Sequence, residues 1–253
     1  MLMHQLPAQL RSLRLHAMAG CLEEQMNMAD IGTFSFDDRL GMMVDREVIA
    51  RENRLLVGRI RKAGLRTNAC MEDIDYRAGR GLERSMMMNL ASCRWVHDHR
   101  GLMVTGPTGA GKTWIACALA HKACIEGYTA KYRRLPNLLR DLDAARELGT
   151  FDRIMSEMAK TDLVVLDDWG LERMNQRQGL SLLELLEDRY DVRSTIVVSQ
   201  IPPETLHDTF RDPTIADAVL DRVIHNSYRI DLKGDSMRKR DSVLTETEAK
   251  VKD

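Results

Sequence analysis

The segment Gly106–Thr113, with the sequence GPTGAGKT, narrows most strongly what this chain can fold into. It matches G-x-x-x-x-G-K-T at every fixed position. The apolar stretch Gly101–Thr105 directly precedes it, and a helical pattern follows. A strand, a glycine-rich turn and a helix N-terminus in this order present backbone N–H groups to phosphate oxygens. The segment therefore predicts a nucleotide-binding α/β domain with ATP and Mg²⁺ as cofactors.

The residue types in this loop each have a chemical reason. Glycines at 109 and 111 let the backbone curl so that successive N–H groups point inward. Lys112 is expected to reach the β- and γ-phosphates, and the Thr113 hydroxyl to ligate Mg²⁺. The alternative is a glycine turn that fits the pattern without binding phosphate. The residues expected to hold the nucleotide are Gly106, Pro107, Thr108, Gly109, Ala110, Gly111, Lys112, Thr113 and Trp114.

A second apolar strand ends in two carboxylates. The stretch Leu163–Asp168 reads LVVLDD, which is typical of a buried strand with acidic residues at its tip. Asp167 is expected to hold the Mg²⁺ shell. Asp168 is expected to polarise the attacking water, although a strand-end aspartate can instead cap the next turn. Its side chain is one methylene shorter than Glu, which favours slow hydrolysis and the behaviour of a switch.

Three further residues are candidates for catalytic roles. Ser199 ends the strand-like stretch 195–199 and could sense the γ-phosphate, or could instead bond into the following loop. Arg222 stands at the end of a helical pattern and could enter the ATP site of a neighbouring subunit, where such an arginine raises the rate about 10³-fold or more. Arg189 is a weaker candidate, and a surface ion pair with Glu187 or Asp188 is favoured for it.

Short apolar strands alternate with helical patterns after residue 100, which predicts a parallel sheet covered on both faces. A predominantly helical pattern without catalytic residues occupies 1–70, with a break near Gly32 and Thr33. We expect a helical N-terminal domain at 1–70 that binds a partner or DNA, an ATPase domain at 71–240 and a polar tail at 241–253. The expected strands are 101–105, 130–133, 163–166, 195–199 and 227–232, and the expected helices 85–99, 114–126, 135–148 and 179–190.

Composition limits the class of protein. No run of 18 or more apolar residues is present, which argues against a membrane span, and the N-terminus lacks the pattern of a secretory signal. The five cysteines are scattered without a C-x-x-C pair, so reduced thiols in the cytoplasm are expected. The formal net charge is only −1, but basic residues outnumber acidic ones up to residue 140 and acidic ones dominate afterwards.

The chain resembles the IstB/DnaC branch of the AAA+ ATPases, and IstB in particular, over roughly residues 75–240. The resemblance is carried by GPTGAGKTWIACALA, DLVVLDDWGLE, LLELLEDRYDVRSTIVVSQIPPETLHD and DPTIADAVLDRVIHNSYRIDLKGDSMRKR. It implies a cytoplasmic ATPase that assembles as a homo-oligomer on duplex DNA and assists a transposase, with hydrolysis as the disassembly switch. In this resemblance Ser199 matches the first sensor and Arg222 the trans-acting arginine, and Lys112, Thr113, Asp167 and Asp168 match the nucleotide and catalytic positions.

The resemblance has two departures. Trp114 stands where relatives often carry His, which we expect to affect packing near the base. The segment after Leu232 is short, which implies a reduced C-terminal lid without a clear second sensor arginine; Arg238 is a weak substitute.

Basic residues after the phosphate-loop helix are candidates for DNA contacts. A protein that binds DNA without sequence preference needs Lys and Arg for the phosphates and few base contacts. Each cluster taken alone is equally typical of a solvated surface. The main cluster is Lys131, Arg133, Arg134 and Arg140. A second consists of Arg77, Arg80 and Arg84, and a third of Arg238, Lys239 and Arg240.

Other functions remain open at this point. A DnaC-like loader of a replicative helicase shares the fold and the chemistry. A small-substrate kinase is a more distant alternative, since neither an acceptor site nor an Arg-rich lid is visible. A DNA-bending protein with an inactive nucleotide site is disfavoured by the intact loop.

Overall fold

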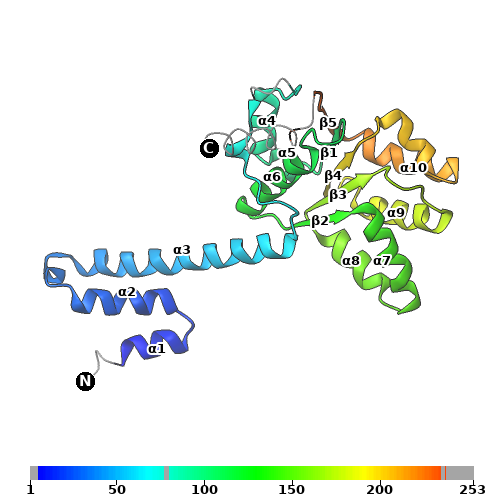
Figure 1. The fold of residues 1–253 in the computed structure, drawn as a ribbon. Helices are drawn as coiled ribbons and strands as arrows, with labels where there is room; N and C mark the ends of the chain where they lie inside the picture. The colour runs from blue at the N-terminus through cyan, green and yellow to red at the C-terminus, as the bar shows by residue number, and fades with distance from the viewer. Residues whose placement is uncertain (1–4, 77–79, 235–236, 238–253) are drawn as a thin grey trace, which may run out of the picture. The chain divides into compact units, whose positions relative to one another are not determined.

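The computed structural model describes residues 5–76, 80–234 and 237 (Figure 1). They form two compact units, which divide between Gly58 and Arg59. Several sequence-based predictions lie outside the described residues, namely those on Arg77, Arg238, Lys239, Arg240 and the tail 241–253. Among the described residues, no helix combines the length and the apolar character that crossing a membrane requires.

The first unit is helical. It contains α1 (Leu6–Ser12), α2 (His16–Asn27) and most of α3 (Phe36–Ala63). A short 3₁₀ turn, Ile31–Thr33, separates α2 from α3, which confirms the break predicted near Gly32 and Thr33. The buried carboxylate of Glu47 on α3 accepts hydrogen bonds from the first backbone N–H groups of α2, at Ala17 and Met18. A carboxylate at this position stabilises the helix N-terminus of α2.

The second unit contains a parallel sheet with the strand order β2-β3-β4-β1-β5. The central strands are almost fully buried, as expected where helices cover both faces. The predicted α/β fold class is therefore confirmed. The strands are β1 (Gly101–Thr105), β2 (Ala130–Arg134), β3 (Leu163–Trp169), β4 (Ser194–Ser199) and β5 (Ser227–Asp231).

Helices form the outer two layers. Figure 1 shows α4, α5 and α6 on one face of the sheet and α7 to α10 on the other, where their apolar side chains form one core with β3 and β4. The helices are α4 (Arg84–Ala91), α5 (Arg94–His97), α6 (Lys112–Ile125), α7 (Leu135–Glu147), α8 (Phe151–Lys160), α9 (Gln176–Arg189) and α10 (Pro213–Ile224), with 3₁₀ turns at Met71–Asp73 and Pro203–Thr209.

Three local predictions need correction. The helix predicted at 85–99 is two helices, because Cys93 adopts a left-handed conformation with φ of 54°. The strand predicted to end at Leu166 continues to Trp169 and carries the two aspartates within it. Helix α8 was not predicted. Its buried residues Phe151, Met155 and Met158 follow the helical spacing of i, i+4 and i+7.

The interpretation of Arg189 as a surface ion pair is wrong. Its side chain is 1% exposed, and its guanidinium donates to the carbonyls of Met158 at 2.5 Å and Thr161 at 2.7 Å. It also donates to the Ser194 carbonyl and, through Nε, to Thr195 Oγ1 at 3.0 Å. Arg189 thus ties the end of α9 to the loop before β3 and to the start of β4.

Candidate functional site

The glycine-rich loop lies between the end of β1 at Thr105 and the start of α6 at Lys112. Its glycines at 106, 109 and 111 have φ of 137°, 84° and 93°, a region that side chains disfavour. At Gly106 the constraint is also steric, since a Cβ would lie 2.3 Å from the carbonyl oxygen of Leu232. The loop therefore has the curled backbone that the sequence motif predicts.

The two residues after these glycines point into the site. Lys112 Nζ donates to the carbonyl oxygens of Gly106 at 2.7 Å and Pro107 at 2.8 Å, which leaves one of its three N–H groups for a phosphate. Burial lowers the pKa of Lys112, and the charges of Asp167 and Asp168 oppose that shift. Thr113 Oγ1 donates to Asp167 Oδ2 at 2.8 Å, so the two expected Mg²⁺ ligands are in direct contact.

Asp167 is 1% exposed and is held by three hydrogen bonds. Besides Thr113, the Tyr132 hydroxyl donates to its Oδ2 at 2.6 Å, and the backbone N–H of Asp168 donates to its Oδ1 at 2.8 Å. Burial and then the bond to Asp167 raise the pKa of Tyr132, so its hydroxyl remains a donor. Tyr132, on the neighbouring strand β2, was not identified from the sequence.

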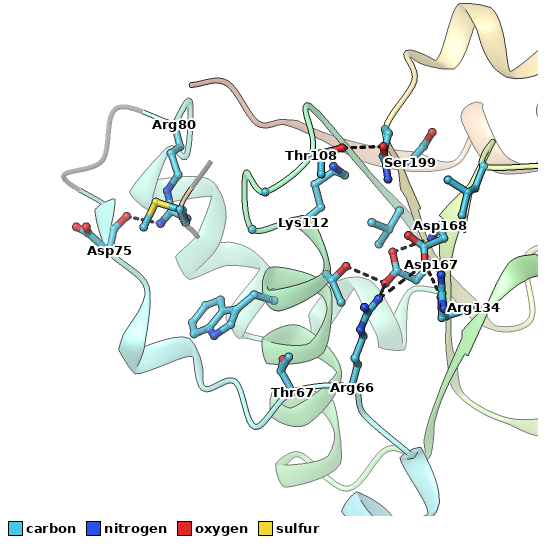
Figure 2. A pocket seen from close by; sticks show the side chains of 18 of the residues that line it. Arg66, Thr67, Asp75, Arg80, Thr108, Lys112, Arg134, Asp167, Asp168 and Ser199 are labelled. Atoms are coloured by element: carbon cyan, nitrogen blue, oxygen red, sulfur yellow. Dashed lines mark hydrogen bonds and ion pairs between the residues drawn. The ribbon is translucent and has the colours of Figure 1, made fainter. Parts of the chain in front are cut away.

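Asp168 adopts a left-handed backbone conformation with φ of 60°, which is uncommon for a residue with a side chain. Two arginines contact its carboxylate (Figure 2). Arg134 Nε donates to Oδ2 at 2.6 Å, and Arg66 Nη1 lies 3.8 Å from the same oxygen. Arg66 Nη1 also lies 4.0 Å from Asp167 Oδ2. Arg134 therefore belongs to this site, and its predicted contact with DNA stays a prediction.

These groups line a cavity of about 700 Å³, within the size range of about 300–1,000 Å³ that is usual for ligand sites. Trp114, Thr67, Asp75 and Arg80 also line it. Two buried polar atoms in its wall, Thr67 Oγ1 and Arg80 Nε, have no hydrogen-bond partner among the residues that the structure describes. A cavity with a phosphate loop, two carboxylates and unpartnered polar atoms fits a nucleotide with a divalent cation.

Arg80 is buried, which corrects its prediction as a DNA-binding residue. Its side chain is 8% exposed, and Nη2 donates to the Asp75 carbonyl at 2.7 Å. A Cβ on Gly111 would lie 3.1 Å from Arg80 Nη1, so the guanidinium packs against the glycine loop. Arg84 lies over the ring of Tyr76, 5.9 Å from its centre.

Ser199 lines the cavity, but its hydroxyl is bonded into the following loop. Ser199 Oγ lies 3.0 Å from the Trp169 carbonyl and 2.9 Å from the Ile201 carbonyl, and it accepts from the Ile201 N–H at 3.1 Å. This is the alternative to a sensor role. The adjacent Gln200 faces the phosphate loop instead, since its Oε1 accepts from Thr108 Oγ1 at 2.8 Å.

Arg222 lies away from this cavity. It forms an ion pair with Glu187 on α9 and donates to the Ala218 carbonyl at 2.9 Å. A small separate hollow includes it together with Arg189. Arg222 therefore does not contact the site of its own chain.

The remaining residues of the expected DNA cluster have partners on nearby helices. Lys131 Nζ lies 2.7 Å from Glu157 on α8, and Arg133 pairs with Asp141 on α7. Arg140 donates to Asn137 Oδ1 at 2.8 Å. A shallow hollow is lined by Tyr132, Arg133, Arg134, Asn137, Arg140 and Asp141. Arg133 and Arg140 share this surface, whereas Lys131 does not line it.

A family model described as IstB-like ATP binding protein matches residues 8–245. The chain belongs to this family. It is 42% identical over 239 residues to the insertion sequence ATP-binding protein y4pL of Sinorhizobium fredii, covering 94% of this chain and 98% of that protein. It is 45% identical over 199 residues to the ATP-binding protein of insertion sequence IS1162 of Pseudomonas fluorescens, covering 78% of this chain and 86% of that protein.

Among solved structures, the fold is similar to those of DnaI and DnaA. The crystal structure of DnaI has a TM-score of 0.58 at 21% identity, covering 66% of this chain and 92% of that one. AMPPCP-bound DnaA from Aquifex aeolicus has a TM-score of 0.57 at 18% identity, covering 72% of this chain and 56% of that one. At these identities the likeness concerns the fold. The predicted resemblance to IstB is confirmed by the family match and by the insertion sequence relatives.

Proposed function

We propose that this member of the IstB-like family binds and hydrolyses ATP with Mg²⁺ in the cavity beside the phosphate loop. The observation that carries the proposal is the 2.8 Å hydrogen bond between Thr113 and Asp167 within that cavity. It joins the residue types that hold Mg²⁺ in phosphate-loop enzymes, one at the N-terminus of α6 and one near the end of β3, which are distant in sequence.

The residues of the site have separable roles in this proposal. Thr113 and Asp167 would hold the cation, which supplies charge neutralisation at the phosphates when bound. Lys112 and the loop N–H groups orient the phosphate chain. The Asp168 carboxylate accepts a proton from the attacking water, and Arg134 fixes its orientation through the Nε hydrogen bond. Trp114 and Thr67 also line the cavity and would contact the base or the sugar of the nucleotide.

We further propose that the protein assembles on duplex DNA as an ATP-dependent homo-oligomer and assists a transposase. The relatives named as ATP-binding proteins of insertion sequences support this reading. Arg222 would act in a neighbouring subunit, which agrees with its position outside the cavity of its own chain. The helicase-loader alternative has support only at the level of the fold.

Substitution of Lys112 tests the proposal. Lys112→Ala is expected to weaken ATP binding about 10- to 100-fold, because a hydrogen bond to a charged group contributes about 1.5–3 kcal/mol. ATP-dependent association with a fluorescent DNA duplex, followed by anisotropy, is expected to disappear with it. The matched control is Lys122→Ala on the same helix, whose side chain pairs with Glu126 outside the cavity.

Two results separate the parts of the proposal. Unchanged ATP affinity in Lys112→Ala would remove the cavity as the nucleotide site. Wild-type protein that binds ATP but shows no preference for duplex DNA in its presence would leave the ATPase and remove the DNA-dependent assembly.

A further inference from the structure

Arg66 is a charged residue of the cavity that no sequence motif identified. It follows the end of α3 at Ala63 by three residues, and Figure 2 shows its side chain reaching the two aspartates. Its Nη1 lies 3.8 Å from Asp168 Oδ2 and 4.0 Å from Asp167 Oδ2. The segment that joins α3 to the rest of the second unit thus places a guanidinium beside the phosphate loop.

The contacts of Arg66 with the carboxylates are loose. Charge-assisted hydrogen bonds between nitrogen and oxygen have lengths of about 2.7–2.9 Å, and Arg134 makes one of 2.6 Å to Asp168. The Arg66 distances are about 1 Å longer. Its side chain is 43% exposed, and a guanidinium carries five N–H donors. Arg66 is therefore able to bind an additional anion while it stays close to Asp167 and Asp168.

The charge balance of this part of the cavity favours such an anion. Around the two aspartates, Lys112 and Arg134 carry two positive charges, which Asp167 and Asp168 balance, and Arg66 adds one more positive charge. Over the whole cavity the charges are even, because Arg80, Asp73 and Asp75 also line it, and Figure 2 shows Arg80 and Asp75 apart from the two aspartates. A planar guanidinium matches phosphate oxygens with two parallel hydrogen bonds, which a lysine cannot provide.

We propose that Arg66 binds the terminal phosphate of ATP within the same chain and makes the site distinguish ATP from ADP. This inference rests on the proposed function of the cavity as an ATP site. Because Arg66 lies in the segment 64–70 directly after α3, the terminal phosphate also restrains that segment. The nucleotide state is thereby transmitted to the chain that leads into the first unit.

Nucleotide affinities of Arg66 variants test this role. We compare the binding of the non-hydrolysable analogue AMPPCP and of ADP, both with Mg²⁺, by titration calorimetry. Arg66→Ala is expected to weaken AMPPCP binding at least about 10-fold, because at least one charged hydrogen bond is lost, and to change ADP affinity less than about twofold. Arg66→Lys is expected to lose part of the AMPPCP affinity, because it keeps the charge and loses the fork. Arg61→Ala, at an exposed position of α3, is the matched control.

Hydrogen exchange of the wild-type protein gives an independent readout. AMPPCP is expected to slow exchange in residues 64–70 more than ADP does, and Arg66→Ala is expected to remove the difference. Three results in an Arg66→Ala variant that keeps the wild-type melting temperature would each overturn the role of Arg66. These are an equal loss of affinity for both nucleotides, no loss of affinity for either, and tighter binding of AMPPCP. Equal exchange of the segment with both nucleotides would overturn it as well. Wild-type protein that binds neither nucleotide would instead refute the underlying ATP site.

Discussion

The orientation of Asp168 depends on one neighbouring side chain. Its left-handed backbone turns the carboxylate away from the course of the strand, and Arg134 meets it there at 2.6 Å. A water-activating carboxylate needs a fixed direction, because proton transfer requires hydrogen-bond geometry between the base and the water. Arg134 is therefore expected to act as a positioning residue for hydrolysis.

Arg134→Ala is expected to lower kcat for ATP at least about 10-fold, because general-base catalysis contributes about 10²–10⁴-fold and depends on position. The KM for ATP should change less than about threefold, since the lost interaction orients a base and does not bind the phosphates. Steady-state ATPase assays measure both. Arg134→Lys should recover part of the rate, and Arg153→Ala on the exposed face of α8 serves as control. A rise in kcat, or a loss confined to KM, would contradict the positioning role.

At this scale the sequence predicts the residues that belong to a motif and misses those that reach the site from other elements. Lys112 and Thr113 belong to the glycine-rich motif, Asp167 and Asp168 belong to the acidic end of an apolar stretch, and the structure brings the four together. Tyr132, Arg134 and Arg66 enter through the neighbourhood of β2 and β3 and through the segment after α3. The order of strands in a parallel sheet is not written in local periodicity, so these contacts could not be predicted.

The alternation of side chains along β2 is a local signal that separates its basic residues into two groups. Side chains alternate between the two faces of a strand, so Tyr132 and Arg134 share a face, and Lys131 and Arg133 share the other. The structure shows this division, because the first pair contacts the aspartates and the second pair contacts Glu157 and Asp141. A run of basic residues along a strand should therefore be divided by period two before it is treated as one patch.

At the scale of elements, Arg189 donates hydrogen bonds to carbonyl groups of a helix end, a loop and a strand start. Its guanidinium is buried among carbonyl oxygens from the end of α8, the loop before β3 and the start of β4. Buried carbonyls without a donor are costly, so removal of the guanidinium affects three elements together. Burial lowers the pKa of Arg189, which reflects the low polarity of this position.

Arg189→Met is expected to lower the free energy of unfolding of the second unit by about 3 kcal/mol or more, because several buried acceptors lose their donor. Urea unfolding followed by tryptophan fluorescence measures this, since Trp95, Trp114 and Trp169 all lie in the second unit. Arg193→Ala is the control, because its ion pair with Asp162 is partly exposed and should contribute less than about 1 kcal/mol. Equal stability of the two variants would show that the guanidinium is dispensable.

Helices and strands are predicted correctly where the hydrophobic periodicity agrees with the residues that mark the ends of the element. The P-loop strand and helix are bounded by glycines, and they appear as predicted with shifts of one or two residues. Helix α8 was missed because only two residues, Gly149 and Thr150, separate Phe151 from the predicted helix end at Leu148. The amphipathic spacing of α8 is present in the sequence, but the break between α7 and α8 depends on the positive φ of Gly149, which periodicity does not specify.

At the scale of the whole molecule, the separation of Arg222 from the cavity concerns how subunits cooperate. The cavity contains Asp168 and lacks Arg222, which stands on α10 and pairs with Glu187. If a neighbouring subunit supplies this arginine, the interface is of the head-to-tail type, in which each subunit offers two different surfaces. A complete site then consists of Asp168 from one chain and Arg222 from the next.

Mixing two inactive variants tests this arrangement. Asp168→Ala and Arg222→Ala are each expected to lose most ATPase activity in the presence of duplex DNA. In an equal mixture, about a quarter of the head-to-tail contacts pair an intact Asp168 with an intact Arg222, so activity should return. It should be greatest near equal proportions, because both kinds of subunit are needed at each restored contact. Mixing Asp168→Ala with the double variant Asp168→Ala/Arg222→Ala is the control that restores no contact. An equal mixture no more active than this control would show that Arg222 does not complete a neighbour's site.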